Sequence, residues 1–287
     1  MATLQEVKKR IESIKKTKKI TNAMQMVAGA KLYKATEKLT HAREMFEEFY
    51  CVINATDFSL FPNENILWQG KKQVNNIGLI VLSSDRGLCG SFNTFILKKL
   101  NDFLVSKKNA QLIMIGKKGL SFCHKNNLTV LQEQNDFLNQ ITFEKATSFF
   151  NEMKNFYLNN KIDELYILYN KFFSVIKQKP VIKRILPVFP LETFHTNKSK
   201  EKPLEYILEP SASIIIDRLI ETYGRTLIYK AFCESVVSEE GSRMNAMKAA
   251  TDNAEDMIDY LTLSYNRVRQ AEITKQIVEI ISAAEAL

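Results

Sequence analysis

Hydrophobic residues recur every three or four positions along both ends of this 287-residue chain, the spacing of a helix that buries one stripe of side chains. The N-terminal stripe spans seven heptads and comprises Leu4, Val7, Ile11, Ile14, Lys18, Thr21, Gln25, Ala28, Leu32, Ala35, Leu39, Ala42, Phe46, Phe49 and Ile53. A heptad period sustained over this length predicts a left-handed coiled coil.

The N-terminal stripe becomes polar over a short stretch, at Lys18, Thr21 and Gln25. There the apolar residues move to a neighbouring stripe, which consists of Ile20, Met24 and Val27. An apolar stripe beside a coiled-coil seam indicates a hydrophobic surface that faces something other than the coiled-coil mate.

The C-terminal end repeats the helical spacing. Its stripes comprise Ile216, Leu219, Tyr223, Leu227 and Ala231, then Met247, Ala250, Ala254, Met257 and Leu261, and finally Ile273, Ile277, Ile280, Ala284 and Leu287. Residues 1–61 and 211–287 contain no proline, which would break a helix interior, so each can form one continuous helix. We predict that the second helix begins near Ser211 or Ser213, and that Gly224 and Gly241 mark a close approach or a bend.

The middle of the chain has a different pattern, in which short apolar runs alternate with helical segments. The runs at residues 77–83, 110–115, 128–131, 164–169 and 175–182 predict strands, and residues 95–105, 119–126 and 142–161 predict helices. This alternation is typical of a three-layer α/β domain with a largely parallel sheet. Residues 186–203 are predicted to form an exposed connection.

The predicted fold class is therefore mixed. A long antiparallel α-helical coiled coil is formed by the N- and C-terminal helices, and a Rossmann-like three-layer α/β domain lies between them in sequence. We assign residues 1–60 to the first helix, 75–195 to the α/β domain and 208–287 to the second helix. Periodicity alone favours a self-contained helical hairpin, whose stripes pack only against each other.

Charge is distributed unevenly between the two helical segments. The whole chain has a net charge of +8, and residues 1–38 alone carry +7, from nine Lys and one Arg against three Glu. Residues 211–287 carry −4, from eight Lys and Arg against twelve Asp and Glu. Opposite signs are compatible with two solvated helix faces, with helices that lie side by side, or with a basic helix that meets an acidic partner.

The sequence offers little chemistry of its own. The four cysteines (Cys51, Cys89, Cys123 and Cys233) and three histidines (His41, His124 and His195) are scattered, so we expect neither a metal site nor a disulfide framework. The glycine pairs 87/90 and 116/119 match neither a Walker A loop nor a dinucleotide fingerprint, and we interpret both as tight turns. We therefore predict no catalytic residue, no cofactor and no metal on this chain.

Three long segments resemble the gamma subunit of F-type rotary ATP synthases. They are KITNAMQMVAGAK at residues 19–31, SSDRGLCGSFN at residues 83–93, and a C-terminal segment with SRMNAMKAATDNA at residues 242–254 and NRVRQAEITKQI at residues 266–277. The chain departs from the family's usual pattern at Gln276, where Glu is usual, and at Ala283-Ala284, where Gly-Ala is usual. Neither departure concerns a catalytic position.

The resemblance implies a central rotor shaft that couples transmembrane proton flow to ATP synthesis or hydrolysis on other subunits. The implied partners are three alpha and three beta subunits, the epsilon subunit and the c-subunit ring. The resemblance implies a peripheral protein at the cytoplasmic face of a bacterial plasma membrane, attached only through the ring, with no nucleic acid.

The resemblance matches Met24, Arg243, Gln270 and Thr274 to positions that face the catalytic subunits. We place the coupling contact itself at the displaced stripe, where Lys18, Lys19 and Val27 lie beside Met24. A bearing at the shaft tip is expected from Ile277, Ile280, Ala284 and Leu287.

Two other functions are compatible with parts of the sequence. The basic N-terminal helix could belong to a coiled-coil tether or a nucleic-acid-binding protein, although no aromatic stacking residues are interleaved with its charges. Alternatively, an α/β enzyme with helical extensions would need a ligand site near residues 87–93.

Overall fold

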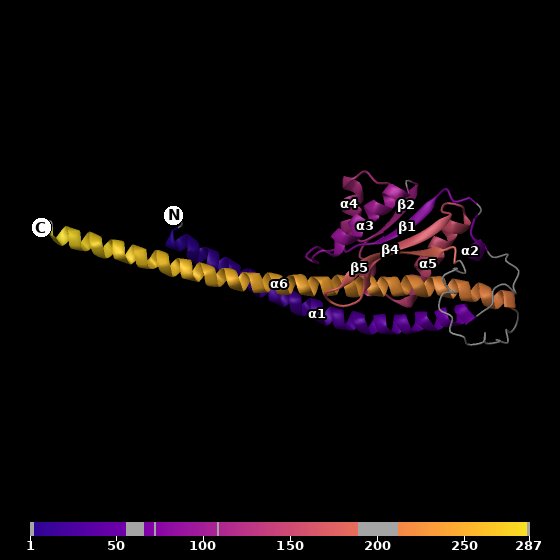
Figure 1. Cartoon of the computed structure of the whole chain (residues 1–287), viewed down its shortest axis with the longest axis horizontal. Helices are drawn as coiled ribbons and strands as arrows, with labels where there is room; N and C mark the ends of the chain where they lie inside the picture. Colours follow the sequence, from indigo (N-terminus) through magenta and orange to yellow (C-terminus); the bar gives the residue numbers. More distant parts are fainter. Residues whose placement is uncertain (1–2, 56–65, 72, 108, 189–211, 286–287) are drawn as a thin grey trace. The chain divides into compact units, whose positions relative to one another are not determined.

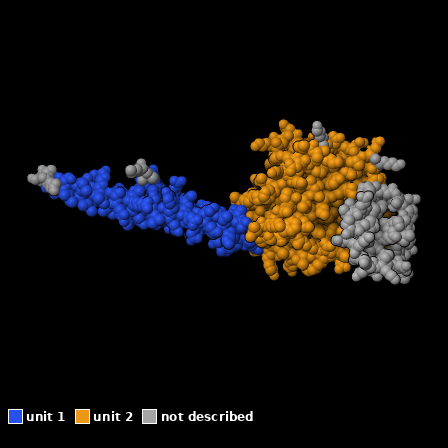
Figure 2. Space-filling model, in the orientation of Figure 1, with its two compact units in different colours: residues 1–29, 243–287 blue, residues 30–242 orange. Residues whose placement is uncertain are grey.

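The computed structural model describes residues 3–55, 66–71, 73–107, 109–188 and 212–285 (Figure 1). Helix α1 spans Leu4–Ala55 and helix α6 spans Ala212–Glu285, which confirms the two long terminal helices and the start of the second. At about 1.5 Å per residue, α6 is about 110 Å long. The chain divides into two compact units, residues 1–29 with 243–287 and residues 30–242, and both helices continue from one unit into the other (Figure 2).

The predicted stripe of α1 is the face that it buries. All fourteen of its positions from Leu4 to Phe49 are buried or half-buried, and Ile53 lies outside the residues whose side chains are described. In the first unit, Thr251 Oγ1 donates to Thr21 Oγ1 at 2.8 Å, and Lys18 Nζ lies 2.8 Å from Glu255 Oε1. From Thr21 to Lys18 the contacts move back three residues along α1, whereas from Thr251 to Glu255 they move forward four residues along α6. The two helices therefore pair antiparallel, as predicted.

Between Leu219 and Leu261, the buried stripe of α6 differs from the prediction at one position. Met257 is half-exposed, at 50%, and the neighbouring Ile258 is the partly buried residue. Because Thr251 is buried against Thr21, the buried positions continue from it through Ala254 and Ile258. The polar residue Thr251 therefore occupies a seam position, and the apolar spacing of α6 alone predicts Met257 in the seam instead of Ile258.

The second unit contains a five-stranded sheet in the order β3-β2-β1-β4-β5. Its strands are β1 (Ile77–Leu82), β2 (Ala110–Ile115), β3 (Val130–Gln134), β4 (Glu164–Phe172) and β5 (Gln178–Leu186). The first four are parallel, and β5 pairs antiparallel with β4. Strand β1 is completely buried, as expected for a central strand of a parallel sheet covered on both faces.

Helices cover both faces of the sheet, which confirms the three-layer α/β prediction. Helices α3 (Phe92–Ser106) and α4 (Lys117–Lys125) lie on one face and α5 (Phe143–Leu158) on the other (Figure 1). The first face buries Leu79, Val81, Ile96, Leu100, Leu112, Met114, Cys123 and Leu168 in one cluster. On the second face, α6 packs on α5, where the rings of Phe149 and Phe232 lie 5.6 Å apart.

Several element boundaries differ from the predicted ones. The two short elements α2 (Ile66–Gln69) and the 3₁₀ helix η2 (Phe137–Gln140) were not predicted. Gly116 has a φ of +100° and forms the predicted turn, whereas Gly119 lies inside α4, where it allows close packing on Ser83. Residues 186–203, which were predicted to form an exposed connection, begin with buried residues. Leu186 ends β5, and the N–H of Val188 donates to the Leu67 carbonyl at 2.8 Å. The rest of that connection lies outside the described residues.

Candidate functional site: the exposed surfaces of the helical hairpin

The four predicted contact residues on α1 have different environments. Val27 is 57% exposed, Lys19 is exposed, and Met24 is half-buried. Lys18 occupies the seam, where it forms the ion pair with Glu255 of α6. Beside them, Ile20 and Met26 are 61% and 66% exposed, so this part of α1 presents the apolar surface that the displaced stripe predicts.

The three predicted contact residues on α6 are far apart. Arg243 is buried, at 8% exposure, whereas Gln270 and Thr274 are exposed and joined by a 2.9 Å hydrogen bond from Thr274 Oγ1 to the Gln270 carbonyl. The 31 positions between Arg243 and Thr274 correspond to about 46 Å of helix. The predicted contact residues are therefore distributed along the hairpin and do not form one cluster.

Among the described residues of the first unit, the C-terminal end of α6 has no helix paired with it. Thr21 of α1 pairs with Thr251 of α6. Seventeen residues before Thr21 is Leu4, the first residue of α1, and seventeen residues after Thr251 is Val268, so α1 begins opposite Val268. Every residue from 269 to 282 is exposed, which agrees with this register. We call residues 269–285 the overhang of α6, which continues past the start of α1 in Figure 1.

The overhang is apolar on more than one side. Ile273, Ile277 and Ile280 of the predicted stripe are 47%, 50% and 69% exposed. Val278 and Ile281, which the stripe misses, are 54% and 52% exposed, and Ala284 is also exposed. Leu287 lies outside the described residues. A broad exposed apolar face on a helix is typical of a surface that other protein covers, so the overhang is a candidate partner surface.

The turn after β1, which is the most motif-like part of the α/β domain, is held by its own side chains. Asn93 Nδ2 donates to Ser84 Oγ at 2.7 Å and to Cys89 Sγ at 3.2 Å. Ser84 Oγ donates to Arg86 O at 2.7 Å, and Gly90 has a φ of +56°. These polar groups therefore stabilise the turn, as the tight-turn interpretation predicts. Among the described residues, no group of three or more His, Cys, Asp or Glu side chains could hold a metal ion.

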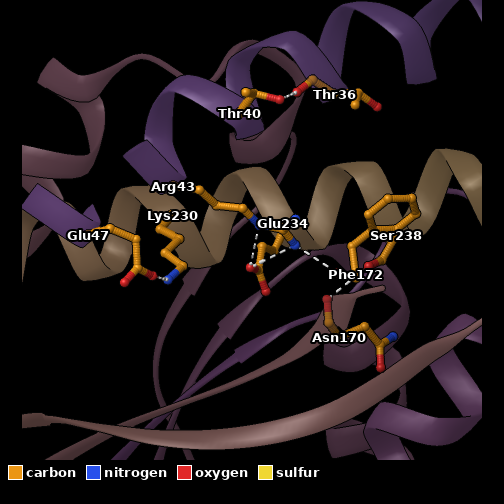
Figure 3. A network of polar contacts seen from close by, with 9 residues as sticks. All are labelled: Thr36, Thr40, Arg43, Glu47, Asn170, Phe172, Lys230, Glu234 and Ser238. Atoms are coloured by element: carbon orange, nitrogen blue, oxygen red, sulfur yellow. Dashed lines mark hydrogen bonds and ion pairs between the residues drawn. The ribbon is translucent and has the colours of Figure 1, made fainter. Parts of the chain in front are cut away.

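A network of polar contacts joins α1, α6 and β4 in the second unit (Figure 3). Arg43 of α1 donates from Nε and Nη2 to Glu234 Oε1 of α6, at 3.2 and 3.1 Å. Arg43 Nη2 also donates to the carbonyl of Phe172, the last residue of β4, at 2.7 Å. The sequence analysis did not identify this pair, because its partners are 191 positions apart and neither belongs to a local motif.

The network lies in a poorly hydrated environment. Glu234 is completely buried, and its burial raises the pKa of the carboxyl group, whereas the Arg43 guanidinium opposes this shift. Burial also lowers the pKa of the Lys230 ammonium, which lies 3.5 Å from Glu47 Oε1 and 3.7 Å from the centroid of the Phe46 ring. Because Glu234 is buried, water screens its charge little, and its interaction with Arg43 is costly to break. Glu47 is 62% exposed, so its pair with Lys230 is screened more strongly.

The fold and these surfaces define a class of protein: a subunit whose two terminal helices pair antiparallel, carry an α/β domain and leave an apolar helix end for a partner. The comparisons identify the family. The family described as ATP synthase matches residues 3–287. The ATP synthase gamma chain of Psychrobacter arcticus is 38% identical, with all of both chains covered. That of Brevibacillus brevis is 39% identical, with 99% of this chain and 98% of the relative covered.

Solved structures show the same fold. A chain of the Euglena gracilis mitochondrial ATP synthase rotor in rotational state 1 has a TM-score of 0.67 at 19% identity, with 94% of this chain and 98% of that chain covered. A chain of the OSCP/F1/c-ring structure of the same synthase in rotational state 3 has a TM-score of 0.69 at 20% identity, with 99% and 94% covered. The chain belongs to the ATP synthase gamma chain family. Among the described residues, no helix is both long and apolar enough to cross a lipid bilayer.

Proposed function

We propose that this chain is the central rotor shaft of an F-type ATP synthase, which couples transmembrane proton flow to ATP synthesis or hydrolysis on other subunits. The observation that carries the proposal is the antiparallel hairpin with an unpartnered apolar overhang, in a chain 38–39% identical to gamma chains over almost its full length. The comparisons give no support to a nucleic-acid-binding protein.

The geometry suits a rotating element. A hairpin of two different helices is asymmetric, so it presents a different face to each of three equivalent partners. Coupling requires that one face stabilises one conformation of a partner over another, because a ligand shifts an equilibrium only through differential affinity. We assign these contacts to Lys18, Lys19, Met24, Val27, Arg243, Gln270 and Thr274.

We further propose the partner subunits of the shaft and its attachment to the membrane. Its partners are three alpha and three beta subunits around the hairpin, together with the epsilon subunit and the c-subunit ring. The ring supplies the only attachment to the membrane, at the cytoplasmic face, and ATP chemistry takes place on the alpha and beta subunits and not on this chain. Residues 277, 280, 284 and 287 form the apolar bearing, where non-directional apolar contacts keep barriers to turning low.

Direct observation of rotation tests the proposed function. Cys51 is the one exposed cysteine of the four, all of which are described, so a biotinylated maleimide can attach a bead near the end of α1. In a complex immobilised through its alpha and beta subunits, ATP is expected to drive unidirectional rotation of the bead. An immobile bead on an assembly that hydrolyses ATP at full rate would contradict the rotor proposal.

Substitutions in the overhang separate binding from stability. Replacing Ile273, Ile277 and Ile280 together by serine should change the unfolding free energy of the chain by less than about 0.5 kcal/mol per site, because all three side chains are substantially exposed. The same variant should bind the alpha/beta assembly more weakly, which a pull-down titration measures.

Leu39→Ala is the matched control, because Leu39 is only 2% exposed in the seam and its truncation should cost about 2–5 kcal/mol. Unchanged binding by the triple serine variant would show that the overhang is not a partner surface.

A further inference from the structure

The contacts between Arg43, Glu234 and β4 join the two paired helices to the sheet around a buried carboxylate. One guanidinium binds a carboxylate of α6 and a carbonyl of β4, so three elements meet at a single side chain (Figure 3). The exposed fraction is 39% for the Arg43 side chain and 0% for that of Glu234, so water does not replace the arginine at the carboxylate.

A second set of contacts lies one turn further along α6. Ser238 Oγ donates to the carbonyl of Asn170 in β4 at 2.9 Å. Asn170 is completely buried, and its Nδ2 donates to the carbonyl of Phe92, the first residue of α3, at 3.0 Å. The contacts thus continue from α6 through β4 to the helix on the opposite face of the sheet. We name Arg43, Glu234, Ser238, Asn170 and the Phe172 carbonyl the clamp.

The chemistry of the clamp differs from that of the surrounding interface. Apolar contacts are individually non-directional, although the close packing of α6 on α5 also resists movement. Hydrogen bonds to a buried carboxylate and to strand carbonyls weaken steeply with angle and distance. Turning or sliding the paired helices against β4 would break the bonds from Arg43 Nη2 to the Phe172 carbonyl and from Ser238 Oγ to the Asn170 carbonyl. Glu234 holds the guanidinium in place for the first of these bonds. The clamp therefore adds contacts to β4 that depend on direction to the apolar packing of α6 on the domain.

We propose that the clamp is the mechanical joint through which torque passes between the paired helices and the α/β domain. This inference rests on the proposed rotor function. A shaft that is turned at its hairpin and loaded at its α/β domain experiences a twisting force at the α6–β4 contact. Arg43 and Glu234 act there as positioning residues, and neither needs to touch nucleotide or a catalytic subunit.

An apolar replacement of the ion pair tests this role. The double variant Arg43→Met/Glu234→Leu removes both charges and retains much of the buried volume, so the chain is expected to fold and assemble. Glu47→Gln is the matched control: it removes an ion pair between the same two helices one turn away, with Lys230, and that pair does not reach the sheet.

Two probe positions distinguish the joint from the motor. One bead is attached at Cys51 on α1, and the other at a cysteine introduced by Val105→Cys, with Cys51→Ser, because Val105 on α3 is 80% exposed. In the parent and in Glu47→Gln, both beads should rotate against viscous load. In the double variant the Cys51 bead should rotate as in the parent, whereas the bead on α3 should stall at loads that the parent drives and show wider angular fluctuations.

Each outcome has a defined meaning. If the bead on α3 drives the same load in the double variant as in the parent, the clamp proposal is wrong. If neither bead rotates in the parent complex, the rotor proposal itself fails. If the double variant does not assemble, Ser238→Ala removes the second set of contacts alone. In Ser238→Ala the bead on α3 should then stall at a lower load than the Cys51 bead, with a smaller difference than in the double variant. If both beads drive the same load, the proposal is overturned.

Discussion

Replacing Gly116 by alanine should prevent the α/β domain from folding stably, with a loss of at least about 3 kcal/mol. Gly116 has a φ of +100°, which side-chain-bearing residues rarely adopt, and its added Cβ would overlap the Ser83 carbonyl oxygen and lie 2.7 Å from the carbonyl carbon. Both obstacles are backbone atoms. Strands β1 and β2 would have to separate, because Ser83 N and Oγ both donate to the Ile115 carbonyl.

Equilibrium urea unfolding of the full chain measures this loss. Gly87→Ala is the matched control, because the only neighbour of its added Cβ would be the flexible Lys118 side chain at 3.8 Å, and its effect should stay within about 0.5 kcal/mol. An unfolding midpoint for Gly116→Ala equal to that of the parent would show that the turn relaxes more easily than its geometry indicates.

The second large effect is expected at Gly224 on α6. An added Cβ would overlap the ring of Phe150 on α5 and lie 2.6 Å from its Cζ, and Phe150 is completely buried. Overpacking of this kind costs about 1–3 kcal/mol. The gain of about 1 kcal/mol that alanine offers over glycine within a helix only partly offsets this cost. We therefore expect Gly224→Ala to destabilise the second unit and to lower its thermal midpoint.

The same helix supplies a control of opposite sign. An alanine Cβ at Gly241 would meet its nearest atoms at ordinary distances, beginning with Gln178 Nε2 at 3.6 Å, so Gly241→Ala should stabilise the chain by up to about 1 kcal/mol. Combining Gly224→Ala with Phe150→Leu should recover part of the loss, which a double-mutant cycle measures. Additive effects in that cycle would locate the cost of Gly224→Ala elsewhere.

The close approach at Gly224 was predicted, but its partner was not. Helix propensity alone marks a glycine in a long helix as unfavourable and therefore as a probable site of close packing. Which residue approaches depends on how α5 lies on the sheet. Gly241 carries the same local signal, yet its neighbours leave room for a side chain. Two glycines of one helix therefore had the same sequence signal and different structural roles.

The polar gap in the N-terminal stripe illustrates a similar limit. Lys18 and Thr21 were recognised as polar positions in an apolar seam, and the displaced apolar residues were expected to face outward, as Ile20 and Val27 do. The seam nevertheless continues through the gap, because α6 places Glu255 opposite Lys18 and Thr251 opposite Thr21. A polar residue in a seam is stabilised only by its partner, and spacing along one helix does not identify that partner.

The order of helices and strands was determined by the sequence itself. A period of 3.6 residues and a buried apolar run are local properties, and proline and glycine limit where they begin and end. The tertiary structure decided which residues meet across long separations. Only the pairing register shows that α6 extends past α1 after Val268 and leaves the overhang without a mate. Likewise, only the packing of both helices on β4 brings Arg43 to Glu234, because an ion pair between distant residues depends on where the backbone places them.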